Sequence, residues 1–379
     1  MKIGIVCYPT YGGSGVLATE LGKALALQGN EVHFITYDQP VRLNDLPSNI
    51  YYHEVRVSDY PLFDYPPYEL VLTSKLADVV KHEGLDILHV HYAIPHASAA
   101  YMAKKMLADE GIHIPFVTTL HGTDITLVGR DSSFIPVVTF AINHSDAVTA
   151  VSHSLKEDTL KYFDIKQSID VVHNFICSDY YTTEVDKSYR STFALENERI
   201  LVHVSNFRKV KRVEDVIKVF QKVREKLPAK LLMVGDGPER HGAEELCRKQ
   251  PFCSDVKFLG KSKSVDRVLS ISDLFVLTSE TESFGLAALE AMACGVPVAS
   301  TNTGGIPEVN IHEFSGLLSN VGDIEDMAKN AVKILAQDSV LNMYKQNAKL
   351  QANKFDIAKI LPAYQEIYDR VLGKSIVPS

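Results

Sequence analysis

The sequence alternates short apolar segments rich in β-branched residues with longer segments of helical periodicity, and it does so in each half. In the first half the apolar segments are Ile3–Cys7, Val32–Thr36, Ile87–Val90, Phe116–Leu120 and Ala147–Val151. In the second half they are Ile200–Ser205, Lys230–Gly235, Val256–Gly260, Leu274–Thr278 and Val296–Thr301. This alternation predicts parallel sheets that carry helices on both faces. Because it runs twice, we expect two doubly wound α/β domains.

The length of 379 residues fits two domains of near-equal size. A strand-like segment at Ile169–Val172 precedes the expected boundary, which gives an N-terminal domain of residues 1–170 and a C-terminal domain of residues 171–355. The final segment, Ile357–Leu372, has its apolar residues on one helical stripe. We therefore expect a C-terminal helix that caps the second domain or, as part of residues 356–379, returns to the first.

Composition excludes several classes of protein. The chain has 39 basic and 47 acidic residues, a formal net charge of −8, and no basic cluster, which argues against nucleic-acid binding. No apolar run reaches the length of a membrane span, and the N-terminus does not resemble an export signal, so we expect a cytoplasmic protein without stable membrane insertion. The five cysteines form no CxxC pair and are expected to be reduced thiols. Nothing in the composition decides whether the protein forms a homo-oligomer.

A glycine-rich loop, Gly12–Gly15, separates the first expected strand from the first helix. Glycines let backbone amides approach an anion, and a helix N-terminus adds positive potential. The stretch from Gly13 to Ala18 also fits the dinucleotide pattern G-x-G-x-x-A, with Asp38 placed to bind a ribose. Three interpretations remain: an anion or ligand site, a tight turn without a ligand, and a nicotinamide site.

The second half contains two spaced carboxylates. Glu282 ends the loop that follows the segment Leu274–Thr278, and Glu290 lies eight residues later within an apolar stretch. We expect Ser283 to cap the helix and Glu290 to lie two turns along it, with both carboxylates facing one cleft. Such a pair suits a ligand with hydroxyl groups at both ends and phosphates between them.

Histidines mark the ends of two strands in the first half. His121 follows the segment Phe116–Leu120. His89 and His91 alternate and so point to one face of their strand, where they could serve as two metal ligands. The sequence contains no D-x-D motif, the usual carboxylate bridge between a metal and a diphosphate. We therefore expect no catalytic metal.

Taken together, these motifs resemble the retaining family-4 glycosyltransferases of the GT-B fold. The matching stretches are the Gly12–Gly15 loop, His121–Asp124, Val234–Pro238, Glu282–Val298 with its Glu-x7-Glu spacing, and Thr303–Glu308. The resemblance covers nearly the whole chain. It implies two Rossmann-like domains that face each other across a cleft, with the nucleotide sugar bound mainly by the C-terminal domain.

The resemblance also implies roles for individual residues. His121, Glu282, Arg208 and Lys211 would be the catalytic residues, the two cations acting on the donor pyrophosphate. Asn206 stands where related enzymes often carry arginine. The expected donor-binding residues are Gly13, Ser14, Gly15, Asn206, Gly235, Gly260, Lys261, Ser283, Phe284, Gly285, Leu286 and Glu290.

Within the family, the stretches Tyr8–Gly15 and Asn206–Arg212 are most similar to enzymes that transfer N-acetylglucosamine from UDP-GlcNAc to L-malate in bacillithiol synthesis. For that acceptor we expect contacts from Gly12, Tyr92 and Arg130. UDP-GlcNAc would be a substrate, and no cofactor is expected. The alternatives are another small-molecule or lipid acceptor, an NAD-dependent dehydrogenase, and a non-catalytic two-domain sugar-binding protein.

Overall fold

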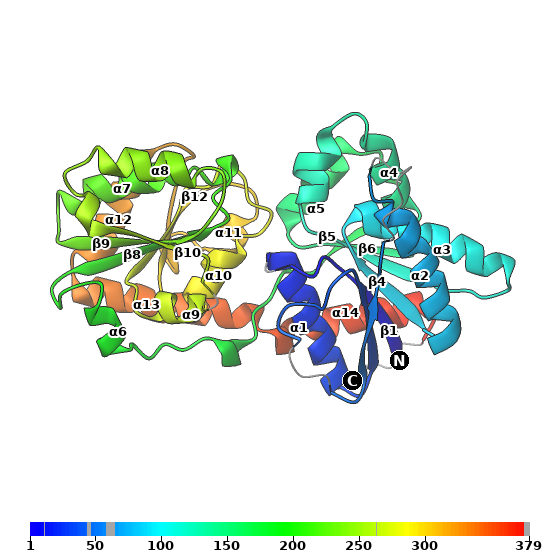
Figure 1. The fold of residues 1–379 in the computed structure, drawn as a ribbon. Helices are drawn as coiled ribbons and strands as arrows, with labels where there is room; N and C mark the ends of the chain where they lie inside the picture. Colours follow the sequence, from blue (N-terminus) through cyan, green and yellow to red (C-terminus); the bar gives the residue numbers. More distant parts are fainter. Residues whose placement is uncertain (11, 44–46, 58–64, 263, 375–379) are drawn as a thin grey trace. The chain divides into compact units, whose positions relative to one another are not determined.

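The computed structural model describes residues 1–10, 12–43, 47–57, 65–262 and 264–374 (Figure 1). The chain forms two compact units. Unit 1 comprises Met1–Phe175 together with the segment that starts at Ile357, and unit 2 comprises Ile176–Asp356. Each unit holds one sheet whose strands all run parallel, as the alternation of strands and helices predicts. The C-terminal helix α14 (Ile357–Val371) belongs to unit 1.

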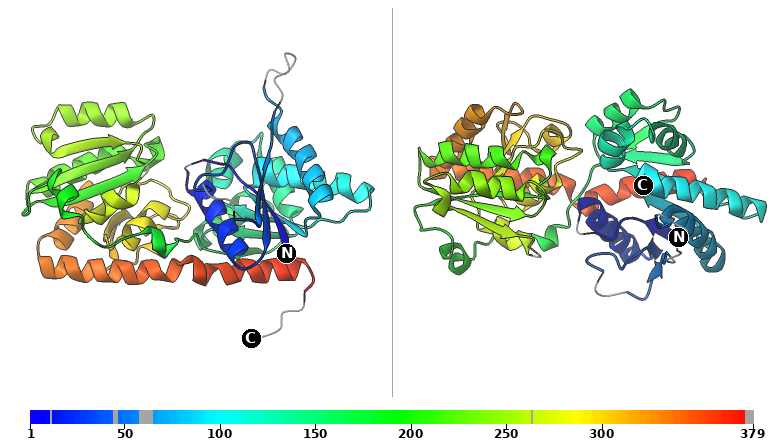
Figure 2. Two further views of the ribbon diagram at one scale, coloured as in Figure 1. Left: turned by 60° about the horizontal axis from the view of Figure 1, so that its bottom comes forward. Right: turned by 45° about the horizontal axis from the view of Figure 1, so that its top comes forward.

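Unit 1 contains a seven-stranded sheet in the order β3-β2-β1-β4-β5-β6-β7. The strands are β1 (Lys2–Val6), β2 (Glu31–Thr36), β3 (Ile50–Glu54), β4 (Ile87–His91), β5 (Phe116–Leu120), β6 (Ala147–Ala150) and β7 (Ile169–Val171). The helices are α1 (Gly13–Leu27), α2 (Tyr68–Glu83), α3 (Ser98–Asp109), α4 (Ile135–Asn143), α5 (His153–Tyr162) and α14. Apolar residues of α2 and α3 pack on one face of the central strands, while α1 and α14 lie side by side elsewhere in the unit (Figure 2).

Unit 2 contains a six-stranded sheet in the order β10-β9-β8-β11-β12-β13. The strands are β8 (Arg199–Ser205), β9 (Ala229–Gly235), β10 (Val256–Gly260), β11 (Leu274–Leu277), β12 (Val298–Thr301) and β13 (Gly316–Ser319). The helices are α6 (Lys187–Ser191), α7 (Val213–Arg224), α8 (Arg240–Arg248), α9 (Val265–Ser270), α10 (Leu286–Ala293), α11 (Ile306–Val309), α12 (Ile324–Leu335) and α13 (Asp338–Ala352). Buried residues of α7, α8, α12 and α13 form its main hydrophobic core with the sheet.

Both sheets reverse their strand order at one place, between β1 and β4 in unit 1 and between β8 and β11 in unit 2. In open parallel sheets, ligands bind beyond the carboxyl ends of the strands at such a reversal. The glycine loop follows β1 and His91 ends β4, whereas Arg208 follows β8 and Glu282 follows β11. The glycine loop, His91, Arg208 and Glu282 therefore lie at the reversal point of their own sheet.

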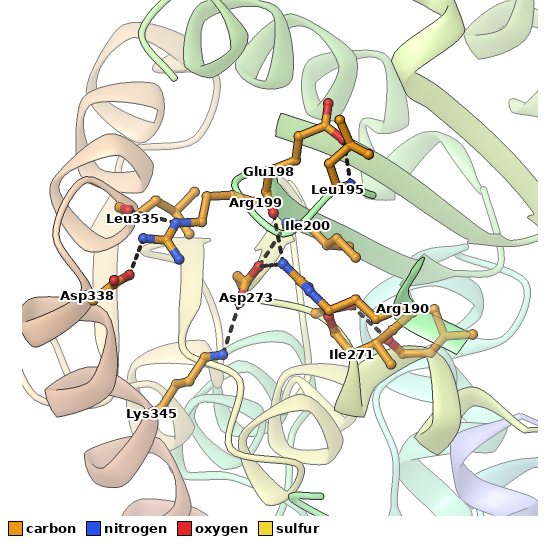
Figure 3. Close-up of polar contacts among 12 residues, drawn as sticks. Arg190, Leu195, Glu198, Arg199, Ile200, Ile271, Asp273, Leu335, Asp338 and Lys345 are labelled. Carbon is orange, nitrogen blue, oxygen red and sulfur yellow. Dashed lines mark hydrogen bonds and ion pairs between the residues drawn. The ribbon is translucent and has the colours of Figure 1, made fainter. Parts of the chain in front are cut away.

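A buried ion network fixes the first part of unit 2 to its sheet (Figure 3). Asp273 is 5% exposed and accepts hydrogen bonds from Arg190 Nη2 at 2.9 Å, Lys345 Nζ at 3.0 Å and the Ile200 amide at 2.9 Å. Burial alone would raise the pKa of Asp273, but the charges of Lys345 and Arg190 bring it below its ordinary value. The network thereby joins α6, α13 and two strands, β8 and β11.

One expectation about the cysteines is wrong. Cys247 of α8 and Cys253 form a disulfide, whereas Cys7, Cys177 and Cys294 are free. The two partners are six positions apart in sequence, and the short turn after α8 returns the chain to within bonding range of the helix end. Because the sequence shows no CxxC spacing, it gave no indication of this pair.

Candidate functional site

In unit 2, the loops that follow β8 and β11 are hydrogen bonded to each other. The Thr278 hydroxyl donates to the carbonyl oxygens of Lys211 and Arg212, at 2.9 and 3.0 Å. The Glu280 amide donates to the Val210 carbonyl at 2.8 Å. These bonds place the cationic loop next to the acidic loop at the carboxyl edge of the sheet.

At this edge Lys211 and Glu282 form an ion pair. Lys211 Nζ lies 2.5 Å from Glu282 Oε1, and their side chains are only 20% and 12% exposed. The Ser279 hydroxyl donates to the same carboxylate oxygen at 2.8 Å. The structure thus brings together two of the predicted catalytic residues. Both contacts use Oε1, so Oε2 remains available to a ligand hydroxyl as far as the described residues show.

Two glycines allow a neighbouring loop to support Glu282. Gly304 has a φ of +55°, and a Cβ there would lie 2.0 Å from the Glu282 carbonyl oxygen. The Gly305 amide donates to that same oxygen at 2.9 Å. The segment Thr303–Glu308, noted in the sequence for its resemblance, therefore holds the backbone that carries the carboxylate.

The start of α10 differs from the prediction. Ser283 does not cap this helix, because the chain enters it through Gly285, whose φ of +99° is the left-handed conformation that favours glycine. The helix begins at Leu286, so Glu290 lies about one turn into it rather than two. Phe284 and Gly285 precede the helix, and its first amides lack acceptors within the helix.

Glu290 has a partner that the sequence analysis missed. The Tyr181 hydroxyl donates to Glu290 Oε1 at 2.9 Å. Tyr181 lies in the segment before α6, which Arg190 and Asp273 fix to the sheet (Figure 3). No short-range pattern could reveal this contact, since the two residues are 109 positions apart in sequence.

The other predicted donor-binding residues of unit 2 lie at the same edge of the sheet. Gly235 ends β9 with a φ of +125°, and a Cβ there would lie 1.8 Å from the Ser205 carbonyl oxygen. Asn206 and Arg208 follow β8 and are exposed. Gly260 ends β10, and the exposed Lys261 comes directly after it.

In unit 1, the glycine loop lies against the end of β4. Gly13 is the first residue of α1, and a Cβ at Gly15 would lie 2.4 Å from the Tyr8 carbonyl oxygen. The Tyr92 hydroxyl donates to Ser14 Oγ at 2.7 Å, although Tyr92 was expected on the acceptor side and Ser14 on the donor side. Burial raises the pKa of Tyr92 to about 12, so its hydroxyl stays protonated.

His121, which directly follows β5, lies in a cluster with the histidines of β4. Its Nε2 lies 2.8 Å from His91 Nδ1, and the His91 ring stacks on His89. Burial lowers the pKa of His121 and of His89 to about 3, so both rings are neutral at physiological pH. The nearby Asp124 is buried and accepts hydrogen bonds from the amides of Ala93 and Gly122.

The remaining site prediction in unit 1 is Arg130. Its backbone lies in the short turn Val128–Arg130, and its side chain lies outside the described part of the structure. Among the described residues, no helix is both long and apolar enough to cross a membrane.

Two family models match the chain, one for each half. Residues 11–180 match the model described as Glycosyltransferase Family 4, and residues 185–351 match the model described as Glycosyl transferases group 1.

Curated relatives extend along the full chain. An N-acetyl-alpha-D-glucosaminyl L-malate synthase of Bacillus anthracis is 49% identical over 377 residues, which cover 98% of this chain and 97% of that protein. A 2-deoxystreptamine N-acetyl-D-glucosaminyltransferase of Niallia circulans is 24% identical over 94% of this chain and 97% of its own length.

Solved structures show the same fold. HepE from Anabaena, in complex with UDP-glucose, has a TM-score of 0.82 at 19% identity and covers 98% of this chain and 100% of its own. Sucrose-phosphate synthase from Thermosynechococcus elongatus has a TM-score of 0.81 at 20% identity, with 99% and 100% coverage. Given the relative that is 49% identical and the glycosyltransferase models that match both halves, the chain belongs to the family-4, group 1 glycosyltransferases of the GT-B fold.

Proposed function

We propose that the protein transfers N-acetylglucosamine from UDP-GlcNAc to the hydroxyl group of L-malate, as the first step of bacillithiol synthesis, with retention at the anomeric carbon and without a metal. The observation that carries the proposal is the 49% identity, over 98% of the chain, to a protein named for the glucosaminyl L-malate product. A structural neighbour in complex with UDP-glucose supports a UDP-sugar as the donor class.

The donor would be held at the carboxyl edge of the sheet in unit 2. The ammonium group of Lys211 has three donors, and one of them serves Glu282, which leaves two for the diphosphate. The exposed Arg208 follows the same strand and can add a bidentate contact. Glu290 would accept hydrogen bonds from the ribose hydroxyls, while Glu282 Oε2 would accept one from the transferred sugar.

Transfer requires stabilisation of the departing diphosphate and removal of the proton from the acceptor hydroxyl. In this proposal the cations and the amides at the start of α10 stabilise the developing charge. The acceptor attacks from the side that the leaving group vacates, and the β-phosphate oxygen of the donor takes the proton. The C–O bond to malate forms as the C–O bond to UDP breaks, which retains the configuration.

The substrate assignment is tested by steady-state measurement of UDP release from UDP-GlcNAc in the presence of L-malate or lactate. Lactate lacks one of the two carboxylates, so the enzyme should prefer malate strongly. The Arg130→Ala variant should lose much of that preference, because a bidentate partner of one carboxylate is gone. Equal rates with malate and lactate would contradict the proposed acceptor, and an unchanged KM for malate in the variant would contradict the role of Arg130.

Metal independence has its own test. We expect full activity in excess EDTA, since Arg208, Lys211 and backbone amides supply the positive charge that a metal would otherwise provide. The measurement is the rate of malate-dependent UDP release before and after chelation. Complete loss that only Mg²⁺ or Mn²⁺ restores would overturn this part of the proposal.

A further inference from the structure

His91 and His121 share a single hydrogen bond within unit 1. His91 lies at the end of β4 and is only 2% exposed, and its Nδ1 is 2.8 Å from His121 Nε2. Burial lowers the pKa of both rings, to about 3 for His121 and well below the ordinary range for His91. Both rings are therefore neutral at physiological pH, and one of the two facing nitrogens carries the proton while the other accepts it.

Two arrangements satisfy this contact. In the first, His91 Nδ1–H donates to His121 Nε2, and His121 carries its own proton on Nδ1. In the second, His121 Nε2–H donates to His91 Nδ1, and His91 carries its proton on Nε2. The arrangements differ in what they leave at His91 Nε2, which is buried and has no hydrogen-bond partner among the described residues.

The first arrangement leaves only a lone pair at His91 Nε2, whereas the second leaves an N–H group without an acceptor. Buried N–H groups without acceptors are rarer in proteins than under-used acceptors. His96 provides an internal precedent. Its Nδ1 contacts the His91 carbonyl, which can only accept, so His96 is protonated there and its buried, unpartnered Nε2 holds a lone pair. This cluster therefore already contains one buried imidazole nitrogen whose lone pair has no hydrogen-bond donor among the described residues.

We propose that His91 is a positioning residue that holds His121 in the Nδ1–H tautomer, so that His121 presents an N–H donor to an oxygen atom of the bound substrates. The substrate contact rests on the proposed function, whereas the tautomer does not. Because His91 occupies the Nε2 lone pair of His121, this ring has no nitrogen left to accept the malate proton. The assignment therefore leaves proton acceptance to the leaving phosphate.

The direct test is nitrogen NMR of the full-length protein labelled with ¹⁵N-histidine. Long-range correlations between ring protons and ring nitrogens show which nitrogen is protonated, and a His121→Asn spectrum assigns the signals. In the wild-type protein without ligand, we expect His121 to be protonated on Nδ1. A His121 ring protonated on Nε2 would overturn the proposal, whatever the activity of the enzyme.

Two substitutions test the positioning role. His91→Leu removes the donor, so His121 should lose its fixed tautomer and kcat/KM for UDP-GlcNAc should fall about tenfold, the effect expected for one misdirected hydrogen bond. His91→Asn places an amide donor near Nδ1, and it should restore the tautomer and most of the activity. The matched control is His89→Leu, because His89 is buried on the same strand and contacts Tyr368 and Thr119 rather than His121.

The control variant should lose stability without a change in the His121 tautomer. If His91→Leu leaves the tautomer unchanged, or if His89→Leu alters it equally, His91 does not position His121. If malate proves not to be a substrate, UDP release fails in every variant while the NMR result stands. Failure of the proposed function and failure of this inference are thus distinguishable.

Discussion

At the scale of single residues, the two carboxylates of unit 2 should give different kinetic defects. Glu290→Ala should raise KM for UDP-GlcNAc about ten- to a hundredfold with a smaller change in kcat, because ribose contacts persist from the ground state to the transition state. Glu282→Ala should lower kcat more, since Glu282 lies beside Lys211 and orients the transferred sugar. Steady-state kinetics on both variants measure the difference. If both variants changed only KM, and by the same amount, Glu282 would not orient the transferred sugar.

Some contacts of the site residues in unit 2 could be predicted from the sequence, and others could not. Glu282 and Lys211 were both singled out from the sequence, and the structure pairs them. Tyr181 was missed because its contact with Glu290 arises only when a distant segment folds back onto α10. The cap at Ser283 was expected from side-chain preference, but the left-handed backbone of Gly285 sets the entry to the helix instead. The charged residues that meet at this edge could be singled out from the sequence, whereas the Tyr181 contact and the backbone conformation at Gly285 could not.

At the scale of elements, the loop that supports Glu282 should not tolerate a side chain. Gly304→Ala would place a Cβ 2.0 Å from the Glu282 carbonyl oxygen, in addition to the strain of a left-handed alanine. We expect a loss of about 1–3 kcal/mol in the free energy of unfolding and a fall in kcat. The matched control is Gly111→Ala, which has a φ of +79° with nothing within 4 Å.

The control variant should show only the conformational cost of a left-handed alanine and should keep wild-type kinetics. Urea unfolding and steady-state kinetics on the two variants provide the measurement. If Gly304→Ala and Gly111→Ala show the same stability and kinetics, the close packing of Gly304 against Glu282 does not matter for activity.

The buried histidines of unit 1 should make the protein sensitive to acid. Burial lowers the pKa of His89 and His121 to about 3 and of His96 to about 4, against about 6.5 in an unfolded chain. Between these values the unfolded chain binds more protons than the folded one. The contribution of these histidines to the free energy of unfolding is therefore fully present above about pH 6.5 and is lost as the pH drops toward 3. Urea unfolding at pH 7.5 and pH 5 should show a lower free energy of unfolding at pH 5.

The matched control for the acid effect is a variant at an exposed histidine. His113→Asn should leave the loss between pH 7.5 and pH 5 unchanged, whereas His89→Leu should reduce it. A loss of the same size in both variants would assign the acid sensitivity to other groups.

Most strands were predictable, and the two that were missed have physical reasons. β3 has the sequence Ile-Tyr-Tyr-His-Glu and lies at the edge of its sheet, where most of its side chains are partly exposed and show no apolar run. β13 has four residues and begins with Gly316, where a Cβ would lie 1.9 Å from the Val298 carbonyl oxygen. Both lie at a sheet edge, and neither contains an apolar run rich in β-branched residues like those that mark the predicted strands.

At the scale of the whole molecule, the predicted site residues are divided between the units. Unit 2 is one continuous stretch of chain, and it carries Lys211, Glu282 and Glu290. Unit 1 is built from two stretches, and it carries His121 and Tyr92. The sequence indicated two domains from its repeated alternation, yet α14 could have served either one. What assigns it to unit 1 is a contact between distant residues, the 2.6 Å hydrogen bond of Tyr368 with His89.

The division predicts that nucleotide binding and sugar transfer can be separated. The two ends of unit 2 meet, since the Ile176 amide donates to the Phe355 carbonyl at 2.9 Å and the Ser178 amide donates to Asp356 Oδ2 at 3.3 Å. The unit also has its own hydrophobic core. Phe355, near its C-terminal end, packs edge to face on Phe284. Residues 176–356 expressed alone should therefore fold.

The isolated fragment should bind UDP, because the residues proposed to hold ribose and diphosphate are all present in it. It should transfer no sugar to malate, because His121 and Tyr92 are absent. Circular dichroism would report folding and calorimetry would report UDP affinity, with the same fragment carrying Glu290→Ala as the matched control. A folded fragment that fails to bind UDP would show that the nucleotide does not bind at the carboxyl edge of this sheet. So would a fragment that binds UDP equally well with Glu290→Ala.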